Sequence, residues 1–195
     1  MRAAPSAVVP LLVAMGLLGG CAGDSTAITS PPLCSHGSTG ADNSVILMAQ
    51  SVPTATWVPC VRSALPLGWS FHHLDARNGV SRFWLDSDRD GQQAVEVRLA
   101  ESCDTAGATQ VPTDREGMTR LERVDRLSPS YAGQRYYRFD GACITVVFAL
   151  DGDNPGEALA LSSQVVGVVA RSDLAAQVQK ESGGRLTLDP PGDGG

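Results

Sequence analysis

The stretch 80–100, VSRFWLDSDRDGQQAVEVRLA, decides the fold of this chain. Its second half alternates the apolar residues Val95, Val97 and Leu99 with charged ones, and such alternation is typical of a half-buried strand. Its first half reads as another strand. The acidic run 86–91 between them offers aspartates that bond to nearby backbone and a glycine that accepts positive φ. The stretch therefore predicts a β-hairpin with an acidic turn.

Strand signals extend outward from this hairpin on both sides. On the N-terminal side, WSFHHLDARNG (69–79) alternates and ends in Asn-Gly, a pair that favours hairpin turns, so a three-strand meander is predicted. On the C-terminal side, a second group of strands is predicted from TRLERVDRL (119–127), QRYYRFD (134–140) and CITVVFAL (143–150). The last of these is apolar on both faces, which is typical of a central strand.

Helices are expected near both ends of this series of strands. Residues 45–65 carry apolar side chains at mixed helical spacing, cut by prolines, which favours one or two short helices over a strand. The tetrapeptide 154–157, Asn-Pro-Gly-Glu, has the cap, proline and glutamate of a helix start, so a helix is predicted from there to about residue 170. A shorter helix is expected over 172–183. The chain is therefore predicted to be an α+β protein with one domain, in which helices near the N- and C-terminal ends pack on an antiparallel meander sheet.

The first residues carry the pattern of a secretion signal. After Met1-Arg2, residues 7–18 are an apolar run that is shorter than the roughly 20 residues needed to span a bilayer. The run ends in Leu18-Gly19-Gly20-Cys21, which resembles the lipobox of bacterial lipoproteins at all four positions. The resemblance implies acylation of Cys21, cleavage before it, and anchorage by acyl chains on the extracytoplasmic face of a cell membrane.

The remaining chain divides by composition. Residues 1–20 are the expected signal peptide, and residues 21–42 hold the lipidated cysteine and a tether rich in small and polar residues. Residues 43–186 form the predicted α+β domain, and residues 187–195 form a predicted disordered tail that is rich in proline and glycine.

The cysteine count fits an oxidising compartment. The chain has five cysteines, and lipidation of one leaves an even number for disulfides. Three pairings are possible; we favour Cys34–Cys60 with Cys103–Cys143, which leaves the two loops unnested. Each bridge would stabilise the fold by about 3.5 to 4 kcal/mol on the chain-entropy estimate.

The acidic turn also raises the question of a metal site. Asp86, Asp88 and Asp90 reproduce the opening of a calcium loop, but the position that needs a bidentate glutamate holds Val97, and both flanks are strand-like. A hairpin turn is therefore favoured, with weak calcium binding as the alternative. A second acidic stretch, 151–154, could share an ion with the first, although its role at a helix start already accounts for it.

Few other residues indicate chemistry. His72 and His73 are neighbours in a predicted strand, so their side chains are expected on opposite faces and unable to bind one metal ion. The motifs G-x-S-x-G, S-x-x-K and H-E-x-x-H do not occur, and no cofactor is expected. The net charge of −6, without a basic cluster, argues against nucleic acid as a partner.

The best candidate for an interaction surface is a cluster of arginines and tyrosines on two neighbouring predicted strands. These residue types dominate binding hot spots, and the cluster could bind an envelope protein or a wall polymer. Its members are Arg120, Arg123, Arg135, Tyr136, Tyr137 and Arg138. The alternative is a solvent-facing sheet surface with cross-strand ion pairs.

These observations favour a membrane-anchored lipoprotein that works outside the cytoplasm as a non-catalytic binding or accessory module. Two other functions stay open at this point. One is an envelope-directed hydrolase without a recognisable motif. The other is a weak calcium-dependent adhesion or stability module.

Overall fold

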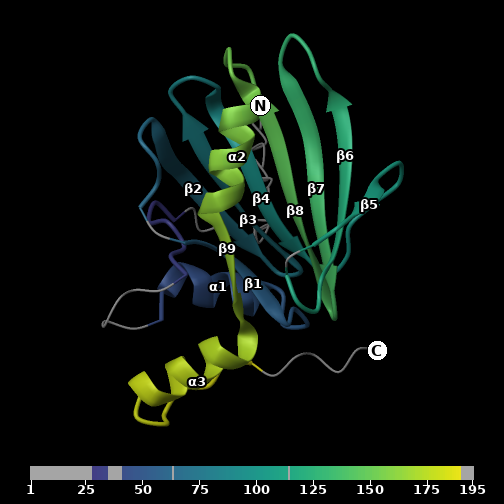
Figure 1. Cartoon of the computed structure of the whole chain (residues 1–195). Helices are drawn as coiled ribbons and strands as arrows, with labels where there is room; N and C mark the ends of the chain where they lie inside the picture. The colour runs from purple at the N-terminus through teal and green to yellow at the C-terminus, as the bar shows by residue number, and fades with distance from the viewer. Residues whose placement is uncertain (1–27, 35–40, 63, 114, 190–195) are drawn as a thin grey trace, which may run out of the picture.

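The centre of the protein is a seven-stranded antiparallel sheet with the strand order β2-β3-β4-β8-β7-β6-β5 (Figure 1). The computed structural model describes residues 28–34, 41–62, 64–113 and 115–189. The strands of the sheet are β2 (Trp69–Arg77), β3 (Val80–Ser87), β4 (Gly91–Ala100), β5 (Thr109–Val111), β6 (Thr119–Arg126), β7 (Tyr131–Phe139) and β8 (Ala142–Leu150). Together with the helices that pack on it, this sheet confirms the predicted α+β class.

Both predicted strand groups are present, and they join into one sheet. β4 pairs antiparallel with β8, so that Val97 lies opposite Val146 and Leu99 lies opposite Ile144. These four side chains are buried, as expected for central strands of a sheet, which have a neighbouring strand at each edge. The apolar run 143–150 is therefore a central strand, as its composition predicts.

The elements outside the large sheet are α1 (Asn43–Ser51), β1 (Trp57–Val61), α2 (Pro155–Val165), β9 (Val166–Ala170) and α3 (Arg171–Glu181). Helices α1 and α2 and a small two-stranded ribbon cover one face of the sheet, and α3 lies beyond it. In Figure 1, α2 and β9 cross in front of the central strands, and α1 lies beside β1 below them. Buried side chains of α1, such as Val45 and Met48, join the same core as Phe83 and Phe148 from the sheet.

The predicted helix over 155–170 is too long. α2 ends at Val165, and the following residues form β9, which pairs antiparallel with β1. The reason is local, because residues 165–169 read Val-Val-Gly-Val-Val, and β-branched side chains lose rotamer freedom in a helix but fit a strand. The prediction of helices alone over 45–65 is also wrong, because the strand β1 follows α1 there. Pro59 fits in β1 because both strands of a two-stranded ribbon are edge strands, which tolerate proline.

Both favoured disulfides are confirmed, with Cα–Cα distances of 4.9 Å for Cys34–Cys60 and 5.8 Å for Cys103–Cys143. The first bridge attaches the end of the predicted tether to β1. Isolated bridges between Ile28 and Leu74 and between Leu33 and Val61 add backbone contacts to the same segment. Residues 28–34 therefore pack on the domain, whereas Cys21 lies outside the described residues.

The start of the predicted tail also belongs to the fold. Leu188 is buried in the core, and the backbone oxygen of Asp189 accepts a hydrogen bond from Arg171 at 2.7 Å. The same buried guanidinium donates to the backbone oxygen of Ala49 at 2.6 Å. Arg171 thus joins α1 to the C-terminal segment. None of the helices in the described residues is long and apolar enough to cross a membrane.

Candidate functional site

The three aspartates of the acidic turn serve three different roles. Asp86 accepts a hydrogen bond from the backbone nitrogen of Gln93 at 2.7 Å and bonds to the His72 ring at 2.9 Å. Asp90 is buried and accepts from the Ser87 hydroxyl at 2.7 Å, whereas Asp88 is exposed. The turn joins β3 to β4, as the hairpin interpretation predicts. The described part of the chain contains no group of three or more histidines, cysteines or acids placed to hold a metal ion.

The hairpin turn contacts the second acidic stretch. The Oδ1 atom of Asp90 accepts a hydrogen bond from the backbone nitrogen of Gly152 at 3.1 Å. A Cβ atom at Gly152 would come within 2.8 Å of that same oxygen, so only glycine allows this close approach. The next residues cap α2 as predicted, because the side chain of Asn154 accepts from the backbone nitrogen of Glu157 at 3.4 Å.

A cavity of about 830 Å³ lies between these segments. Its walls are residues 66–69, which precede and begin β2, residues 87–90 of the hairpin turn, residues 151–154, and the first turns of α2. We call it the acidic cavity, because five of the side chains that line it are carboxylates: Asp88, Asp90, Asp151, Asp153 and Glu157. Its size is within the range of cavities that bind small molecules or short segments.

Charge and apolar surface are combined in the acidic cavity. Arg89 is the lining residue with a positive charge, and Asp151 lies 3.9 Å from Arg126. The apolar lining residues are Pro66, Leu67 and Trp69 on one segment and Ala158 and Leu161 on α2. Histidine and cysteine are not among the described lining residues, and the one serine hydroxyl bonds to a carboxylate. The arrangement can therefore hold a ligand by charge and apolar contact, and its one pair of hydroxyl and carboxylate, Ser87 with Asp90, is buried.

The two neighbouring histidines lie on one face of the sheet, so the expectation of opposite faces is wrong. A β-bulge between Phe71 and His73 inserts one residue into β2 and shifts the alternation. The His72 and His73 rings are consequently only 4.8 Å apart. His73 stacks on Trp84 at 4.3 Å, while His72 bonds to Asp86. The amino-acid sequence gives no sign of this bulge.

The arginine and tyrosine cluster does not form one surface, because alternate residues of β6 and β7 point to opposite faces of the sheet. Tyr137 shares a face with the buried Ile144, and Tyr136 faces the other way. Both tyrosines are buried, with only 2% and 5% of their surfaces exposed for Tyr136 and Tyr137. A recognition surface that needs all six residues is therefore ruled out, and the cross-strand alternative fits, since Arg135 donates to Glu122 at 2.6 Å.

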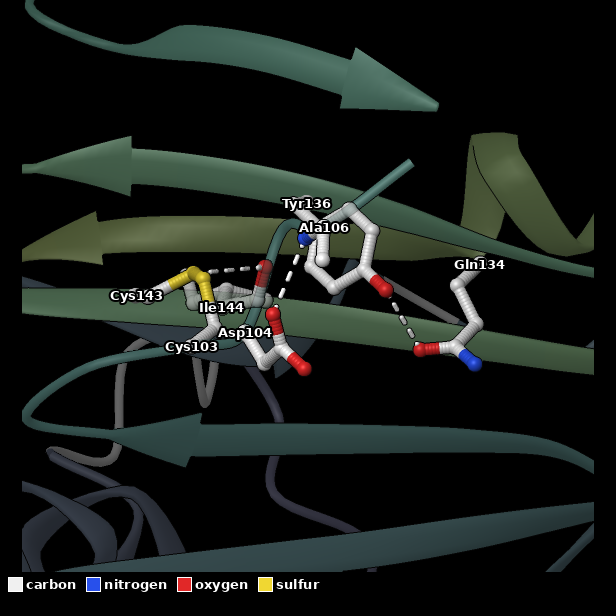
Figure 2. Close-up of a disulfide and its surroundings, with 7 residues drawn as sticks. All are labelled: Cys103, Asp104, Ala106, Gln134, Tyr136, Cys143 and Ile144. Carbon is white, nitrogen blue, oxygen red and sulfur yellow. Dashed lines mark hydrogen bonds between the residues drawn. A yellow bond between two sulfur atoms is a disulfide. The ribbon is translucent and has the colours of Figure 1, made fainter. Parts of the chain in front are cut away.

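The second disulfide lies near the buried Tyr136. Figure 2 shows Cys103 bonded to Cys143, with Asp104 and Ala106 of the following segment drawn close to the Tyr136 ring. The Tyr136 hydroxyl donates to the side-chain oxygen of Gln134 at 2.7 Å. Burial is the main reason that the pKa of Tyr136 is raised above its ordinary value, and the Asp104 charge also raises it. The bridge thus holds a loop on the face of the sheet opposite α2.

Glu122 is the acidic member of an ion-pair group on β6 and β7. Burial by itself raises its pKa, but hydrogen bonds from Arg120 and Arg135 and the charges of both arginines outweigh burial. The pKa of Glu122 therefore lies below its ordinary value of 4.5. A lowered pKa means that the ionised carboxylate stabilises the folded state above the unfolded-state pKa, and that this contribution is lost as the pH falls through the lower, folded-state pKa.

We expect Glu122→Gln to lower the free energy of unfolding at neutral pH and to matter progressively less in acid. The difference in the free energy of unfolding between the variant and the unsubstituted protein should shrink as the pH drops below 4.5, the ordinary pKa of a glutamate side chain. Urea denaturation over a pH series measures this, with Glu101→Gln as the exposed control. A difference that stays constant across the series would contradict the assigned ion pairs.

Comparison of this chain with protein-family models, with curated proteins and with solved structures finds no match.

Proposed function

We propose that this chain is a lipid-anchored protein of the extracytoplasmic membrane face that acts as a non-catalytic binding module and holds its ligand in the acidic cavity. The observation that carries the proposal is the cavity itself, which is lined by several carboxylates and by apolar residues that include Trp69. Binding sites are commonly concave, with apolar walls and a few polar groups that orient the ligand. The one serine among the described lining residues is buried and donates to the buried Asp90, and no histidine lines the cavity within the described residues, which favours binding over hydrolysis.

The anchor rests on the lipobox resemblance at Cys21, together with the disulfides of the domain. Disulfides persist in oxidising compartments outside the cytoplasm, which is the side of the membrane that a lipoprotein faces. A ligand at the same surface, such as an envelope protein, would meet the anchored domain at close range. Such proximity raises the effective concentration of the two partners, so that a weak site is sufficient.

Photocrosslinking in intact cells tests the binding site. A photoreactive phenylalanine analogue replaces Leu67 at the edge of the acidic cavity, or Leu186 as the control. Both leucines are exposed, at 102% and 63%, but only Leu67 lines the cavity. A discrete adduct from position 67 that position 186 does not give is the expected result. No adduct at position 67, or the same adducts at both positions, would overturn the proposed binding site.

A Cys21→Ser variant tests the anchor in the same cells. The variant should be found in the soluble fraction or remain unprocessed, because it lacks the sulfur that accepts the lipid. If it stays in the membrane fraction with normal processing, the anchor is not the lipid. The crosslinking result is independent of this outcome, so the two parts of the proposal can fail separately.

A further inference from the structure

We infer that the acidic cavity binds a basic, amphipathic segment of a partner protein, in which lysine or arginine side chains pair with the carboxylates and a neighbouring apolar side chain covers Leu67. This inference rests on the proposed function and adds the chemical class of the ligand. It follows from the charge of the cavity, from the apolar residues at its edge, and from the contacts that hold its walls in place.

The charge of the cavity favours a cationic ligand. Five carboxylates line it together with the single guanidinium of Arg89. Asp88 and Asp153 are both exposed, and within the described residues neither forms an ion pair. They belong to different walls, the hairpin turn and the stretch before α2. A ligand with positive charges spaced along its length could reach both.

The edge of the cavity favours a ligand that also has apolar groups. The Leu67 side chain is fully exposed, at 102%, and adjoins Pro66 and Trp69 on the same wall. A metal ion would fill little of the 830 Å³ cavity and would leave these apolar side chains without a contact. A small polyamine could neutralise the carboxylates but would leave the leucine in water. A peptide that enters the cavity and continues over its edge would cover both the acidic and the apolar parts.

The walls are held in place before any ligand binds. The backbone nitrogen of Asp88 donates to the backbone oxygen of Gly68 at 2.8 Å, which fixes residues 66–69 to the hairpin turn. On the other side, Asp90 accepts from the Gly152 nitrogen at 3.1 Å, which fixes the stretch before α2 to the same turn. A preformed site loses little conformational entropy when it binds, so short segments can bind it with useful affinity.

Binding of short synthetic peptides to the folded domain, measured by titration calorimetry, tests the inference. The probe is a peptide that alternates lysine and leucine, and the comparison peptides replace lysine by glutamate or leucine by serine. Spermine is the small-cation probe. We expect the lysine–leucine peptide to bind most tightly, and we expect added salt to weaken its binding because exposed charges are screened. Equal binding of spermine, or of the glutamate peptide, would overturn the inference.

Variants place the binding in the cavity. The double variant Asp88→Asn/Asp153→Asn should lower the affinity for the lysine–leucine peptide by about three- to tenfold, as expected for the loss of two exposed ion pairs. The matched control is Glu101→Gln/Glu116→Gln, which removes the same charge at residues that do not line the cavity and should leave the affinity unchanged. Leu67→Ser should weaken binding of the lysine–leucine peptide but leave binding of the lysine–serine peptide unchanged. Equal loss in the cavity variant and the control would show nonspecific attraction and overturn the inference.

Failure of this inference can be told apart from failure of the proposed function. If position 67 gives a specific adduct in cells but the lysine–leucine peptide does not bind, the cavity is a binding site for a ligand of another class. If position 67 gives no adduct, the proposed binding site itself fails.

Discussion

Replacing Gly141 with alanine is expected to lower the free energy of unfolding by about 4 kcal/mol, from backbone strain and overpacking together. Gly141 forms the turn between β7 and β8 with a φ of 76°. A Cβ atom there would lie only 1.9 Å from the backbone oxygen of Thr54, a distance that no side-chain rotation can relieve. The turn also accepts a hydrogen bond at the Asp140 oxygen from Thr56 at 3.0 Å. The substitution must therefore separate the turn from the segment that leads into β1.

Gly79→Ala is the matched control for this prediction. Gly79 has nearly the same backbone conformation, with a φ of 82°, but a Cβ atom there would meet nothing within 4 Å. The control variant should lower the free energy of unfolding by only about 1 kcal/mol, from backbone strain alone. Urea denaturation of the two variants measures the difference. Equal losses would show that the contact between Gly141 and Thr54 is not as close as described.

Replacing both Cys103 and Cys143 with alanine is expected to lower the free energy of unfolding by about 3 to 4 kcal/mol, on the chain-entropy estimate for a bridge of this span. The same change should release the loop that the bridge holds over Tyr136. Tyr136 should then become accessible to tyrosine-modifying reagents, and the amide hydrogens of residues 104–108 should exchange faster in the native state.

The other disulfide supplies the control. Replacing Cys34 and Cys60 with alanine should reduce stability by a similar amount, because the two loops have comparable lengths of 26 and 40 residues. It should leave Tyr136 protected, since that bridge joins β1 to the N-terminal segment. Exposure of Tyr136 in both double variants would mean that global loosening, and not release of the loop, is the cause.

The parts of the fold that local patterns specify could be predicted from the sequence. Alternation in 80–100 identifies the hairpin, and the cysteine spacing led to the pairing that the structure confirms. The C-terminal end of α2 is predicted wrongly because a strong helix start at Asn154 does not determine where the helix ends. The signal that could have placed it is the valine-rich run 165–169, whose β-branched side chains favour a strand.

The candidate site was only half predictable. Both acidic stretches stand out in the sequence, but the hydrogen bond from Gly152 to Asp90 joins residues that are 62 positions apart. Their approach depends on β4 pairing with β8, a long-range contact that no local pattern encodes. The opposite faces of Tyr136 and Tyr137 follow from strand alternation and could have been foreseen. The bulge that brings His72 and His73 together could not.

The Cys34–Cys60 bridge has a mechanical consequence for a domain held at its N-terminal side. A pulling force applied to the chain before residue 28, as through the proposed anchor, would first break the Ile28–Leu74 and Leu33–Val61 bridges, which are only hydrogen-bonded contacts. It would then meet a covalent bond at Cys34 and pass directly to Cys60 in β1. Helix α1 lies inside the closed loop between these cysteines, so the load bypasses it. A pull on the N-terminal side would therefore detach residues 28–33 without stretching that helix.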